Sequence, residues 1–477
     1  MSYLPVINVL DYGVVPNDST TATSNVTNLN ACIVNATNGG GGIVYLPKGI
    51  YYINGTILMK NNVKLLGESN TSFGYKEHYP LDLPFLNNFR TIITALTGSS
   101  QYNMIQFDND DDNIDNDYKR CYQGSEISGL CLFGNKGSSN CLNGIHIKDY
   151  YSYVDSPRGH LRFKNLMIYQ FNGDGFYNGN FQNEIYIDEV NVFDCDQNGF
   201  YLCGQDNKIT RAQSAANGLS GFYIAKGGAG RFYDIDCWNN NYGIEIVDTM
   251  NHFFFGFSAN QNNIGLYIHP GSVNDSYSPL ELNFFRGTFD ANNLCDIKVH
   301  SENPNMGPSY LTFNNCMFRG KESGTKANYA IMDTSYYPSR NIISECIFIK
   351  NNYAVRLINL TTIYKFRDCY DYSNRGVIEE NSNNYKLINT NYNILTTDSY
   401  ISIGNIGANN IELILPVPNS CQVGKMIFVT KIYSCSGYAT LSVAEDYDVL
   451  GDIEVRSLYD TLMIVNAGGS WYSMKIK

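Results

Sequence analysis

The feature that most constrains this chain is a glycine-anchored motif that recurs between residues 161 and 272. The motif appears as NGDGFYN, QNGFYLC, LSGFYIA, NYGIEIV and NIGLYIH, and its glycines are Gly175, Gly199, Gly221, Gly243 and Gly265. They are spaced 24, 22, 22 and 22 residues apart. After each glycine, apolar residues alternate with other residues, which is typical of a strand with one buried face. Such strands can bury that face by stacking on one another, so the repeat predicts a parallel β-helix.

The composition agrees with an all-β protein that is rich in turns. The chain has 38 Tyr and 42 Gly, and only 16% of its residues are charged. Its net charge of -12 argues against nucleic acid or an anionic membrane as a partner. No apolar run is long enough to cross a membrane, so we expect no membrane insertion. The N-terminus, MSYLPVINVLDYG, lacks the basic and apolar regions of a signal peptide, so we expect either export without the secretory route or a trimmed chain.

The cysteines are odd in number, 13, and are scattered rather than clustered in CxxC pairs. Several recur at one position of the repeat: Cys195, Cys237, Cys316, Cys346 and Cys369. This spacing disfavours a zinc site or a disulfide framework and predicts a column of small buried residues inside the solenoid. We expect no cofactor and no metal.

The N-terminal segment carries a recognisable pattern. It contains VLDYG, then a helical stretch, then GGGGIVYLPKGIYYINGTILMKNNVKLLGES. With Leu46-Pro47, Gly49, Tyr51 and Gly67 in place, the segment resembles the N-terminal signature of pectate-lyase-superfamily proteins. The resemblance implies a right-handed single-stranded parallel β-helix with an N-terminal capping helix. One departure is PNDSTTATSN, which stands where the family usually has an acidic run.

The capping helix has a physical purpose, since the end of a solenoid exposes apolar side chains and unpaired backbone. Leu29, Cys32, Ile33 and Ala36 supply its apolar face at helical spacing.

The rest of the chain divides by its pattern. We expect the cap and first rungs in residues 1–68, the β-helix body in 69–385, a linker in 386–399 and a small β-sandwich in 400–477. Within the body, the acidic run DNDDDNIDND, residues 108–117, lacks the glycine and glutamate of a calcium-binding EF-hand loop, so we expect a solvated loop. The ending GGSWYSMKIK resembles the modules that close viral and phage fibres. That resemblance implies a homotrimer.

A column of tyrosines is expected on the outside of the solenoid. Stacked rungs place equivalent residues about 4.8 Å apart. The outward residues two positions after the anchor glycines are His146, Tyr177, Tyr201, Tyr223, Glu245 and Tyr267. With small residues at the next outward position, this column describes a groove whose aromatic faces could pack against sugar rings. The alternative is that tyrosine is simply a good strand former.

Candidate acid–base residues lie in RFYDIDCWNNNYGIEIVD. Asp234, Asp236 and Trp238 are expected to point outward together, with the two carboxylates roughly 6.5–7 Å apart. That distance is near the low end of the separation used by inverting glycosidases. Glu245, on the next strand, completes the candidate catalytic set, and Trp238 joins the tyrosines as a candidate substrate-binding residue.

Two further observations bear on this set. Arg231 could orient an acidic sugar or steady a carboxylate. Outward aspartates are common on any solenoid, however, and EIYIDEVNVFDCD offers a rival set: Asp188, Glu189, Asp194 and Asp196.

The functional prediction follows from these features. The NTD, DD, GHG and RIK motifs of the polygalacturonase branch do not appear in the rungs, which argues against pectin as the substrate. In style the chain is most similar to phage tailspikes, which implies a virion or extracellular protein that binds and depolymerises a bacterial surface polysaccharide, as an endo-glycosidase in preference to a lyase. The alternatives are a non-catalytic glycan-binding adhesin and a structural fibre shaft.

Overall fold

The computed structural model describes residues 5–69, 90–107, 124–150, 160–180, 184–270, 281–301, 310–320, 329–335 and 339–349, together with shorter stretches between 351 and 476. The acidic segment 108–117 lies outside these residues. Packing divides the chain into two compact units, one of residues 1–352 and 361–373 and the other of residues 353–360 and 374–477.

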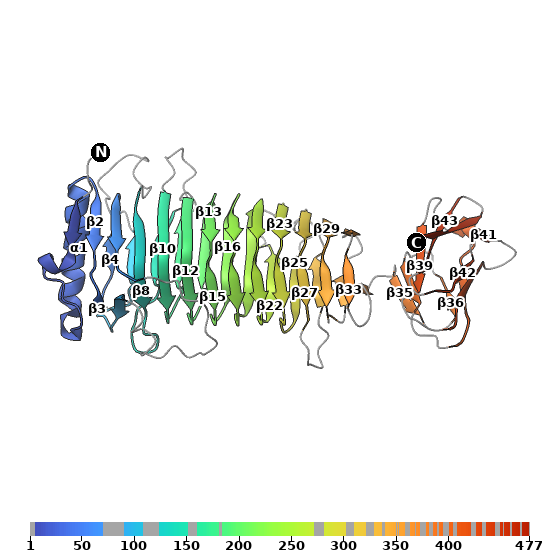
Figure 1. Ribbon diagram of the computed structural model, residues 1–477, viewed down its shortest axis with the longest axis horizontal. Coiled ribbons are helices and arrows are strands. Elements are labelled where there is room, and N and C mark those ends of the chain that lie inside the picture. Colours follow the sequence, from blue (N-terminus) through green and yellow to red (C-terminus); the bar gives the residue numbers. More distant parts are fainter. Residues whose placement is uncertain are drawn as a thin grey trace. The chain divides into compact units, whose positions relative to one another are not determined.

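The first unit is the predicted right-handed parallel β-helix (Figure 1). One sheet takes a single strand from each turn, and these strands pair in parallel. In the first unit they are β4 (Ile57–Met59), β7 (Ile105–Phe107), β9 (Ile145–Tyr150), β11 (Phe176–Asn180), β13 (Phe200–Gln205), β16 (Ser220–Gly228), β19 (Tyr242–Met250), β22 (Ile264–His269), β25 (Cys295–Ser301) and β28 (Tyr329–Ser335). We call this the single-strand sheet.

The other sheet has 22 strands and in most turns takes two short strands, so we call it the paired-strand sheet. Its first strands are β1 (Val6–Asn8), β2 (Gly42–Tyr45), β3 (Gly49–Ile53), β5 (Val63–Leu66), β6 (Thr91–Ala95), β8 (Glu126–Phe133), β10 (His160–Tyr169) and β12 (Glu184–Phe193). The pairs that follow are β14 (Lys208–Thr210) and β15 (Gln213–Ala215), β17 (Arg231–Tyr233) and β18 (Asp236–Trp238), β20 (His252–Phe255) and β21 (Ser258–Asn260), and β23 (Glu281–Phe285) and β24 (Thr288–Asp290). The last pairs are β26 (Tyr310–Asn314) and β27 (Met317–Arg319), β29 (Arg340–Ser344) and β30 (Ile347–Ile349), and β32 (Ile363–Arg367) and β33 (Tyr370–Tyr372).

Columns of like residues hold successive turns together. Phe254 stacks between Phe232 and Phe284, with ring centroids 4.5 and 4.7 Å away. The predicted cysteine column is confirmed: Cys195, Cys237, Cys316 and Cys346 are buried free thiols, and Cys369 is half-buried. The anchor glycines are required by close packing, because a Cβ at Gly199 would collide with the Ser214 hydroxyl.

The predicted capping helix is α1 (Ala22–Asn38), and Leu29, Cys32, Ile33 and Ala36 are all buried. It lies beside the first strands, β2 to β5 (Figure 1). Buried Asn25 fixes the chain that enters the helix, since its side chain accepts a hydrogen bond from the Val15 N–H at 2.8 Å and donates one to the Val15 carbonyl at 3.0 Å.

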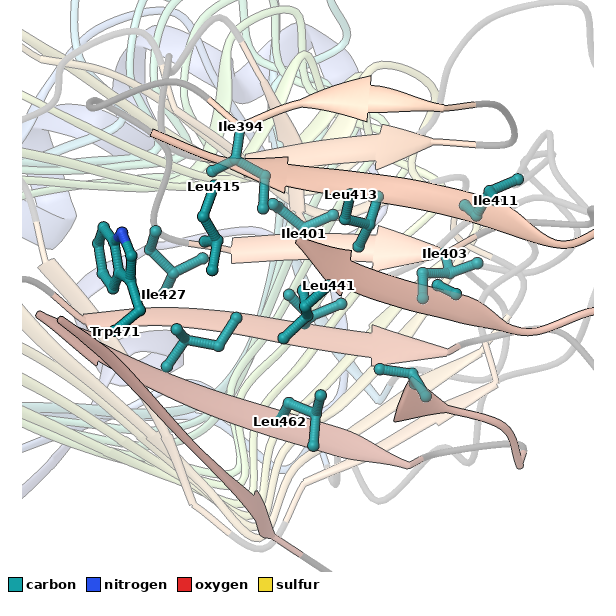
Figure 2. Close-up of a cluster of buried hydrophobic side chains, with 14 residues drawn as sticks. Ile394, Ile401, Ile403, Ile411, Leu413, Leu415, Ile427, Leu441, Leu462 and Trp471 are labelled. Atoms are coloured by element: carbon teal, nitrogen blue, oxygen red, sulfur yellow. The ribbon is translucent and has the colours of Figure 1, made fainter. Parts of the chain in front are cut away.

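The second unit holds the small C-terminal sheets. β35 (Tyr385–Ile388), β37 (Tyr400–Ile403), β39 (Met426–Lys431), β43 (Thr461–Asn466), β44 (Trp471–Ile476) and β41 (Val449–Gly451) form one sheet. The other contains β36 (Tyr392–Asn393), β38 (Ile411–Leu415), β40 (Ala439–Val443) and β42 (Glu454–Val455). The two sheets share one apolar core (Figure 2). Within it, Trp471 is fully buried and its indole N–H donates to the Pro416 carbonyl at 2.7 Å.

Part of the segment expected as a linker, 386–399, instead lies in strands. β35 pairs in parallel with β37, and β36 pairs in parallel with β38. From β35 to β40 the chain therefore alternates between the two sheets with parallel pairing, as in a second short winding, before antiparallel β43 and β44 end it. With four and two residues, β35 and β36 are too short to show a repeat in the sequence.

Candidate functional site

The predicted tyrosine column is present on the outer face of the single-strand sheet. Successive strands bring His146, Tyr177, Tyr201, Tyr223, Glu245 and Tyr267 into register. The Tyr201 ring lies 4.6 Å from Tyr177 and 4.8 Å from Tyr223, measured between centroids. We call the outer surface formed by Tyr177, Tyr201, Tyr223, Glu245 and Tyr267 the tyrosine face.

The orientation of the rings differs from the expectation. The Tyr201 ring plane lies within 22° of those of its neighbours Tyr177 and Tyr223, so the rings stack on one another along the solenoid. Strand spacing causes this, because flat side chains in register at about 4.8 Å cover each other's faces. The inner rings of this stack therefore offer edges and hydroxyl groups to a ligand rather than open ring faces.

Glu245 interrupts the tyrosines and has polar partners on two sides. Its side chain is largely buried even though it occupies an outward position. One carboxylate oxygen accepts a short hydrogen bond from the Ser220 hydroxyl, and Oε1 lies 2.9 Å from Nε2 of His269. Ser220 lies on β16 and His269 on β22, so three successive turns build this cluster.

The contacts of His269 constrain where the protons lie. Its Nδ1 lies 2.8 Å from the Pro270 carbonyl, and its Nε2 faces Glu245. A neutral imidazole donates from only one nitrogen. Both contacts are hydrogen bonds at the same time only if one proton lies on Nδ1 and another lies between Nε2 and the Glu245 carboxyl.

Aromatic and cationic groups border the pair. The His269 ring stacks on Tyr267 at 4.3 Å, and Tyr242 lies 5.0 Å from Tyr267, again between centroids. The Lys298 ammonium sits 5.0 Å from the centre of the Tyr267 ring. The cluster thus combines a carboxyl, an imidazole, a hydroxyl and a nearby positive charge, which are the groups that acid–base chemistry uses.

Asp236 lies in the paired-strand sheet and Asp234 lies at the bend before it, whereas Glu245 lies in the single-strand sheet. Asp234 is exposed and adopts a left-handed backbone, with φ of 51°, at the bend between β17 and β18. The two aspartates therefore do not share one continuous strand, and the strand spacing assumed from the sequence does not apply to them. Burial raises the pKa of Asp236, a hydrogen bond with Gln213 opposes the rise, and the Asp234 charge adds to it.

The other predicted residues of this region also lie apart from Glu245 in the sheets. Arg231 is exposed on β17. Trp238, on β18, is half-buried, packs against an apolar cluster that includes Ala215, and has its ring 5.7 Å from Phe193. Its partners make Trp238 a packing residue.

The rival carboxylates are engaged in ion pairs. Arg211 binds both oxygens of Asp188 at 2.7 Å and reaches Glu189 at 3.2 Å. Lys136 reaches Asp194 at 2.6 Å and Asp196 at 3.2 Å. The Arg211 pairs connect neighbouring turns and the Lys136 pairs reach across two turns, as expected of structural contacts.

Two site residues escaped the sequence reasoning. Ser220 precedes an anchor glycine, and His269 lies two residues after Tyr267, at the next outward position of the same strand. The outward alternation along β22 was a signal that could have found His269. Among the residues that the structure describes, no group of His, Cys, Asp and Glu could hold a metal ion. No helix in the described part of the chain is both long and apolar enough to cross a membrane.

These features define a right-handed parallel β-helix of the pectate lyase type with a polar cluster on its outer surface. The chain belongs to the family described as Rhamnogalacturonase A/epimerase, pectate lyase-like, whose model matches residues 6–245. No curated protein sequence matches the chain significantly.

Two solved structures give the same fold. The A-module of mannuronan C-5 epimerase AlgE4 from Azotobacter vinelandii is 16% identical, with a TM-score of 0.52 over 79% of this chain and 98% of that one. The AlgE6 A-module from the same organism is 14% identical, with a TM-score of 0.52 over 78% and 97%. The tailspike gp49 of Acinetobacter baumannii bacteriophage Fri1, a capsular polysaccharide depolymerase, is 13% identical, with a TM-score of 0.40 over 99% and 79%. For the two epimerase modules, this likeness shows the fold alone.

Proposed function

We propose that this protein binds a polysaccharide along the tyrosine face and cleaves it there, with Glu245 as the acid–base residue. The observation that carries the proposal is the largely buried Glu245, which sits in the tyrosine column between the Ser220 hydroxyl and the His269 imidazole. Membership of a rhamnogalacturonase- and epimerase-type family supports a polysaccharide as the ligand.

The proposed chemistry follows from the position of Glu245 in the tyrosine column. A carboxyl that holds a proton in a largely buried site can donate it to a glycosidic oxygen as the bond breaks. The Ser220 hydroxyl, which donates a hydrogen bond to Glu245, would then stabilise the carboxylate that remains. Water would add to the anomeric carbon, and its proton would return to the Glu245–His269 pair. The row of tyrosine edges and hydroxyls would align the chain along the solenoid. We favour hydrolysis because this step needs a proton donor, and elimination at a uronic acid is the runner-up. The pair Asp234 and Asp236 is the alternative catalytic set.

The biological setting that we propose is a phage tailspike or related extracellular protein that acts as a trimer on a bacterial surface polysaccharide. The fibre-like C-terminal sequence supports this setting. A non-catalytic adhesin is the second candidate. The ring stacking favours it, because stacked tyrosines stabilise neighbouring turns even where no reaction occurs beside them.

The test is product formation on a panel of bacterial capsular and wall polysaccharides. Hydrolysis would release new reducing ends without the near-ultraviolet absorbance of unsaturated uronates, and elimination would produce both. A change in uronate composition without new chain ends would indicate epimerisation and would refute cleavage. Binding without any product across the panel would support the adhesin instead.

A further inference from the structure

A second surface, on the outer face of the paired-strand sheet, has the features of a ligand site. Strands β10, β12 and β14, with the bend after β17, form a groove of about 540 Å³. Its lining residues are Arg162, Lys164, Tyr186, Ile187, Asp188, Lys208, Thr210, Arg211 and Asp234. We call it the basic groove. It lies on a different sheet from the tyrosine face.

The charge of the groove opposes that of the chain. Its lining holds four cations and two carboxylates, whereas the whole chain carries a net charge of -12. One carboxylate, Asp188, is already paired, since it accepts hydrogen bonds from Arg211 and Thr210. Burial acts to raise the pKa of Asp188, but these hydrogen bonds outweigh it and lower the pKa. A local positive surface on an acidic protein attracts anions.

The cations that remain are free to bind a ligand. Among the described residues, no hydrogen bond or ion pair engages the side chain of Arg162 or Lys208, or that of Arg231 just beyond the groove. Lys164 lies near Asp188 and helps to hold that carboxyl ionised. The groove therefore offers exposed cations whose charges its own carboxylates leave uncompensated.

These cations form a row along the solenoid. Register pairs Arg162 with Tyr186, Tyr186 with Lys208 and Lys208 with Arg231. At about 4.8 Å per turn, Lys208 lies roughly 10 Å and Arg231 roughly 14 Å from Arg162 along the axis. Charges repeated in this way match a linear polyanion laid along the groove better than they match a single small anion.

We propose that the basic groove binds an anionic polysaccharide, with carboxylate or sulfate groups of the sugar paired to Arg162, Lys208 and Arg231. Arginine suits this task because its planar guanidinium can bind a carboxylate or an ester sulfate through two parallel hydrogen bonds. The inference goes beyond the proposed reaction, since binding in this groove does not require catalysis at Glu245. It places a holding site for the acidic chain on a surface separate from the tyrosine face.

The experiment measures binding of a polyuronate, a sulfated glucan and a neutral glucan to the full chain by calorimetry at low and high salt. The test variant is Arg162→Gln, Lys208→Gln, Arg231→Gln. The matched control removes two arginines and one lysine that are exposed elsewhere, as Lys48→Gln, Arg340→Gln, Arg367→Gln.

We expect at least one anionic glycan to bind, with an affinity that falls about tenfold or more in the test variant and also falls with added salt, because exposed charge pairs are screened. The control should bind as the unmodified protein does, and the test substitutions should not change binding of the neutral glucan. Preference for the polyuronate or for the sulfated glucan would identify the anionic group.

Equal binding of the anionic glycans by the test and control variants would overturn the proposal. So would the absence of anionic glycan binding together with a change of oligomeric state in the test variant, which would make the groove an interface between copies of the chain. Failure of cleavage with intact, groove-dependent binding would refute the proposed reaction and leave this inference standing.

Discussion

At the scale of single residues, burial in the solenoid changes the chemistry of a carboxyl group. Asp174 is 5% exposed, and its Oδ1 accepts hydrogen bonds of 2.9 Å from both the backbone N–H and the side-chain amide of Asn198. Burial is the largest influence and raises the pKa of Asp174 to about 6, against the opposing effect of these bonds. As the pH rises, the folded protein thus retains on Asp174 a proton that the unfolded chain loses near pH 3.8, the ordinary pKa of an aspartate. The contribution of this group to stability is therefore full at low pH and is lost as the pH rises through about 6.

The variant Asp174→Asn keeps an acceptor for Asn198 and removes the ionisation. The difference in free energy of unfolding between the variant and the unmodified protein should shift in favour of the variant by up to about 3 kcal/mol from about pH 4 to pH 8. About two pKa units between the folded and unfolded chain correspond to that energy. Urea unfolding at both values measures the change, with exposed Asp11→Asn as the control for loss of a charge. A difference between variant and parent that does not vary with pH would contradict this account.

At the scale of strands and turns, an asparagine ladder holds the bend before the single-strand sheet. Asn217, Asn240, Asn262 and Asn292 are buried on successive turns, and each amide bonds to the next at 3.0 to 3.4 Å. Each side-chain oxygen also accepts the backbone N–H of the preceding asparagine at 3.0 Å. The ladder satisfies backbone groups that no strand reaches, which is required of polar groups in a core.

Replacement of a central member should be costly. Asn240→Ala removes bonds to Asn217, Asn262 and the Ser214 carbonyl and leaves their partners buried, so we expect it to lower the free energy of unfolding by about 2–4 kcal/mol. Asn263→Ala, at an exposed asparagine, should change it by less than about 0.5 kcal/mol. Denaturant titration compares the two, and equal small effects would refute a structural role for the ladder.

The strands were easier to predict than the bends between them. The alternation after each anchor glycine predicted β11, β13, β16, β19 and β22, and with them the tyrosine column. The bend between the two strands of each pair gave only an irregular signal. Asp234 and Gly256 at this bend are residue types that favour positive φ, whereas Glu189 and Arg211 adopt positive φ without such a preference. For that reason the sequence predicted Asp234 and Asp236 on one strand face. The sequence missed the contacts of Ser220 and His269 with Glu245 for another reason, because these three residues come from three different turns.

At the scale of the whole molecule, the chain has two compact units, each with its own apolar core. The repeat predicted the first unit, and the change of pattern after residue 380 predicted a second. The sequence did not show the parallel winding of β35 to β40, because each of its turns is too short to leave a period. Each unit contains one of the two tryptophans, Trp238 in the first and Trp471 in the second.

This distribution allows the units to be followed separately. Fluorescence of Trp471→Phe reports on the β-helix, and fluorescence of Trp238→Phe reports on the C-terminal unit. We expect their urea unfolding curves to have different midpoints, because separate cores need not melt together. A circular dichroism curve of the unmodified protein with two steps, at the midpoints of the two fluorescence curves, would confirm separate unfolding. If the circular dichroism curve and both fluorescence curves superimpose, the two units unfold as one cooperative unit.

The central claim, that chemistry occurs at Glu245 on the tyrosine face, is tested most directly by comparing two variants on the polysaccharide that the panel identifies as a substrate. We predict that Glu245→Gln lowers the initial rate of cleavage by about 100-fold or more, as expected for loss of an acid–base group, while glycan affinity is retained. Asp234→Asn, Asp236→Asn should cleave at nearly the parent rate. Full activity in Glu245→Gln, or loss of activity only in the double variant, would contradict the account and assign the reaction to the aspartates of the paired-strand sheet.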